Sequence, residues 1–171
     1  MKRFVLLALV TCVWVAGCDD DNGTAPTNLP VVFSALLSPA AEIPAVVGPE
    51  TSGRGAVQFT IFPTRDAAGN ITAATATFHI QLYDFPGGVS VTGAHIHEGG
   101  SNVAGPVRIS TGIAPGQVVL TDGTLDMNIR GIAVTPALAE AIIQNPAGWY
   151  FNIHSTANPG GFARGQLSRV R

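Results

Sequence analysis

Two histidines separated by one residue, His95 and His97, are the side chains of this 171-residue chain best suited to do chemistry. If they lie on an extended strand, both point to the same face, about 6–7 Å apart along the strand. Two imidazoles at that spacing can bind one metal ion. A third histidine, His154, lies in another strand-like run near the C-terminus. The pattern therefore predicts a three-histidine metal site, provided that the two strands are neighbours.

The residue types narrow the choice of metal only in part. Three imidazoles suit copper, zinc, iron and nickel without selecting strongly among them. Copper(I) accepts three histidines in trigonal geometry, whereas copper(II) needs a fourth ligand such as water. A hydrolytic zinc site needs a general base, and the nearby Glu98 would lie on the opposite face of the strand. A second interpretation stays open, in which the histidines form a hydrogen-bonded polar cluster with Asn152 and Ser155.

The elements that must position these histidines are short β-rich runs separated by turn residues. Expected strands cover residues 31–38, 55–62, 71–82, 89–97, 107–109, 124–129, 148–154 and 165–170. Alternation puts the three imidazoles on faces opposite the apolar side chains, and His79 on a solvent-facing side. One helix is expected, with Thr135 as N-cap, Pro136 at its first position and Asn145 at its end. The pattern predicts an antiparallel β-sandwich or closed barrel with one short helix.

The N-terminus predicts export to the cell envelope. Lys2 and Arg3 precede an apolar stretch, residues 4–15, which is too short to span a membrane and is typical of a signal peptide. The following Val15-Ala16-Gly17-Cys18 resembles the bacterial lipobox, which implies that Cys18 is lipidated and that residues 1–18 are the signal. An ordinary signal peptide with an incidental cysteine is the alternative. Residues 19–30 are almost free of apolar side chains and predict a flexible tether.

The composition of the exported part excludes several classes of function. It has no cysteine apart from Cys18, so neither a disulfide nor a thiolate nucleophile is available to residues 31–171. Seven arginines, no lysine and eleven carboxylates give a net charge of −4, with no basic run, which argues against nucleic acid as a partner. No Ser/His/Asp order and no paired carboxylates predict a hydrolase, so no catalytic residue is assigned.

Several separated motifs resemble one known family. They are Phe33-Ser34-Ala35-Leu36, Glu42-Ile43-Pro44, Ala94-His95-Ile96-His97, Gly105-Pro106-Val107 and the run from Tyr150 to Leu167. In this order they resemble the CHRD domain, which is named for chordin and is common in bacterial exported proteins. The resemblance covers roughly residues 31–171 and implies one β-sandwich domain there. The family has no firmly established biochemical activity, so the resemblance informs the fold more than the function.

A more distant likeness is to copper/zinc superoxide dismutase. Those enzymes carry a His-x-His pair on one strand and a further copper ligand on a late strand, an order that His95, His97 and His154 match. The likeness implies an immunoglobulin-like or dismutase-like sandwich with copper as the candidate cofactor. The bridging and zinc-site histidines and the cysteines of the enzyme are absent. Arg164 lies in a loop like the one that carries the enzyme's anion-guiding arginine, which makes it a candidate anion-binding residue, although its offset from Asn158 does not match.

Two further residues have competing interpretations. Glu42 is expected to be a turn carboxylate that accepts backbone N–H bonds, or else a ligand. Arg164 has a structural alternative, an ion pair with Asp126 or Glu42.

Together these patterns predict a lipoprotein anchored to a bacterial membrane through Cys18, on the periplasmic or extracellular side. Its expected function is that of a non-catalytic binding module with a transition-metal site at His95, His97 and His154. One alternative is a copper-dependent, dismutase-like oxidoreductase. Another is a structural module that binds protein or glycan through its loops; the sequence names no such partner.

Overall fold

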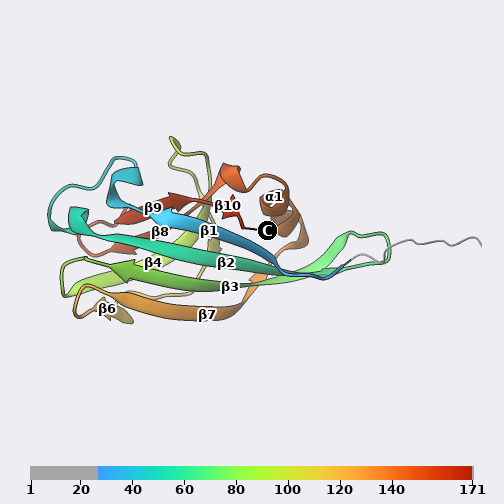
Figure 1. Ribbon diagram of the computed structural model, residues 1–171, viewed down its shortest axis with the longest axis horizontal. Coiled ribbons are helices and arrows are strands. Elements are labelled where there is room, and N and C mark those ends of the chain that lie inside the picture. The colour runs from blue at the N-terminus through green and yellow to red at the C-terminus, as the bar shows by residue number, and fades with distance from the viewer. Residues whose placement is uncertain (1–26, 171) are drawn as a thin grey trace, which may run out of the picture.

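The computed structural model describes residues 27–170, which form two antiparallel β-sheets packed face to face around one core (Figure 1). The strands are β1 (Val31–Leu37), β2 (Arg54–Arg65), β3 (Ile71–Tyr83), β4 (Val89–Glu98), β5 (Val107–Ser110), β6 (Val118–Leu120), β7 (Leu125–Val134), β8 (Trp149–Ser155), β9 (Ala163–Gln166) and β10 (Ser168–Arg169). One sheet has the order β10-β1-β2-β3-β7, and the other has the order β5-β4-β8-β9, with β6 also paired to β4. The predicted all-β sandwich is confirmed.

Short helical segments join the strands. Three 3-10 turns, η1 (Pro39–Ala41), η2 (Pro49–Ser52) and η3 (Pro146–Gly148), accompany one α-helix, α1 (Pro136–Gln144). The helix begins as predicted, with the Thr135 hydroxyl accepting the Leu138 N–H, and it buries Ala139 and Ile142. It ends where Asn145 precedes a proline. Among residues 27–170, no helix is long and apolar enough to cross a membrane.

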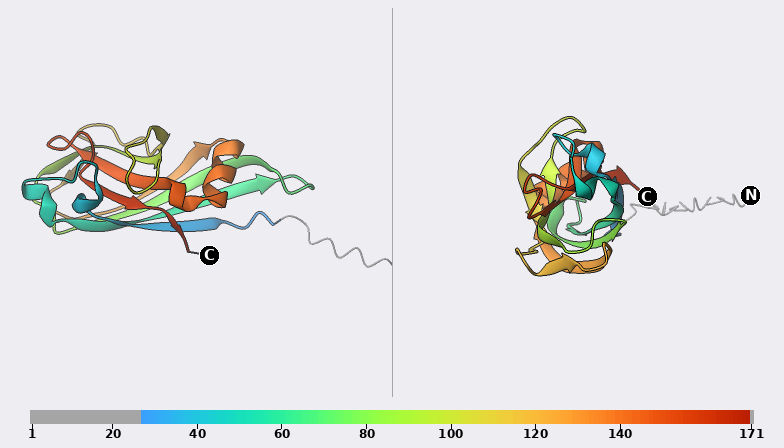
Figure 2. Two further views of the ribbon diagram at one scale, coloured as in Figure 1. Left: turned by 90° about the horizontal axis from the view of Figure 1, so that it is seen from above. Right: turned by 90° about the vertical axis from the view of Figure 1, so that its left-hand side faces the viewer.

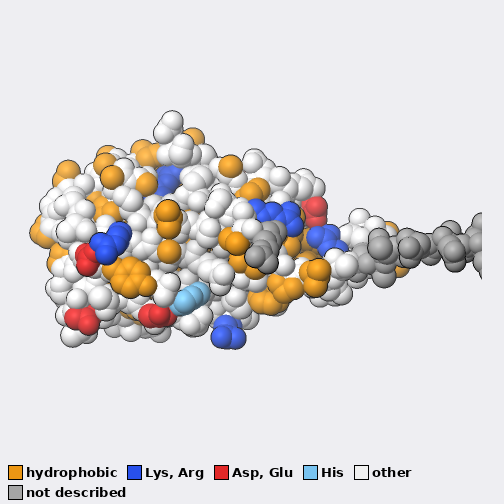
Figure 3. Space-filling model, viewed as in Figure 1, with side chains coloured by type: hydrophobic (Ala, Val, Ile, Leu, Met, Phe, Trp, Pro, Cys, Tyr) orange, Lys and Arg blue, Asp and Glu red, His pale blue; other side chains and the backbone are white. Residues whose placement is uncertain are grey.

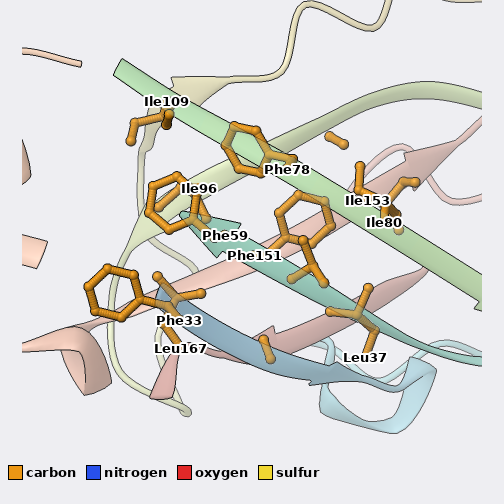
Figure 4. Close-up of a cluster of buried hydrophobic side chains, with 14 of the residues drawn as sticks. Phe33, Leu37, Phe59, Phe78, Ile80, Ile96, Ile109, Phe151, Ile153 and Leu167 are labelled. Atoms are coloured by element: carbon orange, nitrogen blue, oxygen red, sulfur yellow. The ribbon is translucent and has the colours of Figure 1, made fainter. Parts of the chain in front are cut away.

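The core lies between the sheets and is centred on aromatic rings. Phe33, Phe59 and Phe78 from the first sheet and Phe151 from the second form a continuous series, with successive ring centroids 5.9, 4.9 and 6.0 Å apart. All four side chains are fully buried, and aliphatic side chains such as Ile96 surround them (Figure 4). Because the chain from Val31 onward has no cysteine, this burial of apolar surface must supply the stability of the domain.

The sequence missed some strand details for physical reasons. β6 has only three residues, too few to show an alternating pattern. The predicted strand 165–170 is divided at the buried Leu167, so that β9 stays in the second sheet while β10 pairs with β1 in the first. The predicted strand 124–129 continues to Val134, because its partner β3 is long enough to pair that far. Seen from one end, the strands of both sheets surround a common core (Figure 2).

Two predictions concern the N-terminal part of the chain. The predicted signal, the lipidation site Cys18 and most of the tether lie outside the described residues. Residues 27–30, at the end of the predicted tether, are exposed and have no regular structure.

On the face shown in Figure 3, acidic and basic side chains are sparse and interspersed, and no patch of one sign stands out.

Candidate metal centre

The three histidines lie on adjacent strands, as the predicted site requires. β4 and β8 pair so that His95 lies opposite Asn152, His97 opposite Tyr150, and Gly93 opposite His154. These side chains occupy the outer face of the second sheet, because their neighbours in both strands, such as Ile96 and Phe151, fill the core. Alternation along both strands therefore delivers all three imidazoles to one face, with the surrounding loops partly covering them.

The imidazoles converge. One nitrogen from each of His95, His97 and His154 lies within 4.8 Å of the other two. Three atoms so spaced share a point no more than about 2.8 Å from each, close to the 2.0–2.1 Å of a zinc–imidazole bond. The ring centroid of His95 is 4.9 Å from that of His154 and 5.7 Å from that of His97. A movement of under about 1 Å would bring all three nitrogens to bonding distance.

Backbone carbonyls fix the orientation of two rings. His97 Nδ1 lies 2.8 Å from the Gly105 carbonyl oxygen, and His154 Nδ1 lies 2.8 Å from the Pro159 carbonyl oxygen. A carbonyl only accepts, so Nδ1 carries the hydrogen in both rings and Nε2 keeps its lone pair. Hydrogen bonds of this kind are the usual way in which proteins orient metal-binding histidines.

The nitrogens that remain have no hydrogen-bond partner. Among the described residues, five buried side-chain atoms are unpaired: His95 Nδ1, His97 Nε2, His154 Nε2, Asn152 Oδ1 and Glu42 Oε1. All five belong to this cluster or to the residues next to it. His97 Nε2, His154 Nε2 and Asn152 Oδ1 can only accept a hydrogen bond or bind a cation, and His95 Nδ1 can do the same in the tautomer that carries its hydrogen on Nε2. Buried polar atoms are nearly always paired. The concentration of unpaired acceptors fits a bound cation, with His95 contributing Nδ1 and the other two histidines Nε2.

The electrostatic environment keeps the histidines uncharged. Burial, followed by the charges of His154 and His97, lowers the pKa of His95 to about 4. Burial also lowers the pKa of His97 and of His154, against the opposing effect of their carbonyl hydrogen bonds. A metal binds the neutral imidazole, so the folded protein holds the three rings in the protonation state that binding requires.

A stack of side chains supports His97. The Tyr150 ring stacks on it nearly parallel, at a centroid distance of 4.8 Å, and the Arg164 guanidinium carbon lies over the Tyr150 ring, 3.4 Å from its centroid. Arg164 also donates to the carbonyls of Gly100 and Val103, and it is only 2% exposed. Arg164 therefore anchors the loop that covers the site; that it binds an anion stays a prediction.

The surroundings of the Glu42 side chain differ from those that the sequence predicted. Its side chain is 6% exposed and faces the Asn152 amide across Gly161, where a Cβ would overlap both groups. No hydrogen bond joins the Glu42 side chain to a backbone N–H in the described structure, so the expected turn carboxylate is not observed. Burial raises the pKa of Glu42 to about 7, while Asn152 and the charge of Arg164 act in the opposite direction. Of the two predicted partners of Arg164, Glu42 is the one nearby.

Of the alternative hydrogen-bonded cluster with Asn152 and Ser155, the structure contradicts the part played by Ser155, whereas Asn152 lies beside His97. Ser155 lies on the other face of β8 and donates to Glu50 instead of to an imidazole. Asn152 donates to the Gly160 carbonyl, at 3.3 Å. Outside the cluster, His79 is a solvent-side residue as predicted and contacts Asp126, and Glu98 forms an ion pair with Arg108 away from the histidines.

The comparisons identify the family. A family model described as the CHRD domain matches residues 33–167, most of the chain and all of the strands that carry the site. The chain belongs to the CHRD family. This confirms the resemblance seen in the sequence motifs. Comparison of this CHRD protein with curated proteins and with solved structures finds no match.

Sequence reasoning found the three histidines of the CHRD domain but missed part of their surroundings. Alternation already placed Tyr150 beside Asn152 and His154, and this pattern could have indicated the ring that stacks on His97. Glu42 was considered as a possible ligand, but no local pattern placed it beside Asn152, because it reaches the site from the loop after η1, more than fifty positions before His95.

The first prediction concerns Gly93, next to His95. A Cβ at this position would lie 2.9 Å from His95 Cε1, closer than real Cβ contacts allow. Gly93→Ala should therefore rotate the imidazole and weaken metal binding by about tenfold or more, an effect comparable with the loss of a supporting residue. The measurement is a metal titration of the variant. Gly100→Ala is the control, because a Cβ there meets nothing within 4 Å; equal affinity of the two variants would contradict the prediction.

The second prediction concerns pH and the metal-free protein. Because the pKa of Glu42 is higher in the folded state (about 7) than its ordinary value of 4.5, its protonated form favours folding. This contribution is complete below about pH 4.5 and is lost as the pH rises through 7, a change of about 1–3 kcal/mol. Urea unfolding at pH 5 and pH 8 should show that the unaltered protein loses this much stability relative to Glu42→Gln as the pH rises.

The comparison with Glu42→Gln is needed because other groups titrate nearby. The lowered pKa of His95 makes stability rise with pH between about 4 and 6.5 in both proteins, and the lowered pKa values of His97 and His154 act in the same direction. Arg164 keeps its charge throughout. If the two proteins show the same dependence on pH, Glu42 does not have the raised pKa.

Proposed function

We propose that this CHRD protein is a non-catalytic, membrane-anchored module of the bacterial cell envelope that binds one transition-metal ion at His95, His97 and His154. The observation that supports this most is the meeting of three uncharged imidazoles, two of them oriented by backbone carbonyls, whose facing nitrogens have no protein partner. An apolar or fully hydrogen-bonded arrangement would avoid the cost of these unpaired atoms.

Copper is the leading metal in this proposal. The order of the three histidines matches that of copper ligands in copper/zinc superoxide dismutase, and imidazole donors suit copper as well as zinc. When bound, the metal would supply an open coordination position beside the three nitrogens. The chain's own residues orient the ligands, through the carbonyls of Gly105 and Pro159 and the stacked ring of Tyr150.

The test is the metal content of the full chain purified after export in a bacterial host. We expect about one copper ion per chain, lost in His95→Ala and retained in His79→Ala, which alters a histidine outside the cluster. Metal-free protein that also fails to take up copper or zinc on titration would refute the proposal. Superoxide consumption faster than that of free copper would instead favour the oxidoreductase alternative.

The anchor is a separate part of the proposal. Acyl chains on Cys18 would bind the membrane, and a second signal such as dual acylation makes this attachment stable. We expect Cys18→Ser to move the protein from the membrane fraction to the soluble fraction and to abolish incorporation of labelled fatty acid. Unchanged incorporation in the variant would show that Cys18 is not the lipidated residue.

A further inference from the structure

We propose that Asn152 and Glu42 form a second part of the metal site that favours a divalent ion over copper(I), with Asn152 Oδ1 as the fourth donor atom. This inference rests on the proposed function, because it concerns the ion held by the three histidines. Both side chains are more than nine-tenths buried, and both keep an unpaired oxygen beside the cluster.

The position of Asn152 follows from strand pairing. It lies directly opposite His95 on the outer face of the sheet, between Tyr150 and His154 along β8. Its amide is within interaction distance of His97, where it opposes the lowering of the His97 pKa. Its nitrogen donates to the Gly160 carbonyl, which fixes the orientation of the amide. The oxygen of this amide is buried and has no hydrogen-bond donor of its own, and the amide lies beside His97.

Glu42 lies behind this amide. Gly161, with φ +131, brings the loop so close that a Cβ would overlap both Glu42 Oε1 and Asn152 Nδ2. Asn152 Nδ2 has two hydrogens, so it can serve both the Gly160 carbonyl and the Glu42 carboxylate. A carboxylate that polarises the amide makes its oxygen a stronger donor to a metal ion. Arg164, the cation near Glu42, is already held by the carbonyls of Gly100 and Val103.

The oxygen donor of Asn152 and the negative charge of Glu42 should both favour a divalent ion over copper(I). Copper(I) is soft and is satisfied by three imidazoles, whereas copper(II) and zinc take a fourth ligand and tolerate oxygen donors. The attraction between a carboxylate and an ion is twice as strong for a double positive charge as for a single one at the same distance. Removing the amide oxygen or the carboxylate should therefore weaken divalent binding far more than copper(I) binding.

The experiment compares two affinities in the full chain, for copper(II) in air and for copper(I) under reducing, oxygen-free conditions, each by competition with a chromophoric chelator. Glu42→Gln and Asn152→Ala should lower the copper(II) affinity about 10–100-fold, as loss of outer ligand-supporting groups does. Both should change the copper(I) affinity less than about threefold. Asn152→Asp, which places a charge on the donor itself, should raise the affinity for copper(II) relative to copper(I).

Two control variants distinguish a failure of this inference about selectivity from a failure of the proposed metal-binding function. Glu50 is a carboxylate of the same 6% exposure, but Ser155 and Asn158 satisfy it, so Glu50→Gln should leave the ratio of the two affinities unchanged. His95→Ala should lower both affinities. If it lowers neither, the proposed function is wrong. If it lowers both while Glu42→Gln and Asn152→Asp leave the ratio unchanged, only the present inference is wrong.

Discussion

Replacing His97 with alanine is expected to lower the affinity for copper or zinc by at least about 100-fold, more than the loss of an outer supporting residue. The loss follows from the geometry, because His97 is one of three converging nitrogens and is held by Gly105 and Tyr150. The fold should persist, since the side chain lies on the outer face of the sheet. Competition titration of the purified full chain measures the effect.

His79→Ala is the matched control for this experiment. His79 also lies on a strand, but its ring contacts Asp126 and points away from the cluster. Its replacement should leave the affinity within about twofold of the original, as is usual for a surface change remote from a site. Equal losses in the two variants would mean that the bound metal is held by scattered surface histidines.

Replacing Phe78 with alanine is expected to cost about 3–5 kcal/mol of unfolding free energy. Phe78 is fully buried and contacts Phe59 within its own sheet and Phe151 across the sandwich, so its removal leaves a cavity between the two layers. A domain of this size has only about 5–15 kcal/mol in total. The variant should therefore unfold at a much lower urea concentration than the original protein.

Phe62→Ala is the control for this prediction. Phe62 belongs to the neighbouring strand β2 but is 40% exposed, and its replacement should cost about 1 kcal/mol or less. If the two variants unfold at the same urea concentration, the layer of stacked rings is not the centre of the core.

Alternation along the strands made much of this architecture predictable. The apolar residues Ala94, Ile96, Phe151 and Ile153 all face the core, and this alternation placed each of the three imidazoles on the opposite face of its own strand. The helix was predicted to within a residue because Thr135 and Pro136 are strong signals for a helix start. These inferences succeeded because they depend on local geometry with a fixed period.

The remaining features depend on contacts between distant parts of the chain. The pairing of β4 with β8 joins segments more than fifty residues apart, and no local pattern fixes its register. Glu42 reaches Asn152 only because the loop at Gly161 passes close to both. The carbonyls of Gly105 and Pro159 that orient the imidazoles belong to the backbone, and a sequence does not show where they point.

The most direct test of the central claim is a crystal structure of the protein prepared with one equivalent of copper, with anomalous scattering measured at the copper edge. We expect one strong peak at bonding distance from His95 Nδ1, His97 Nε2 and His154 Nε2. A peak elsewhere on the molecule, or no peak between these three rings, would contradict it.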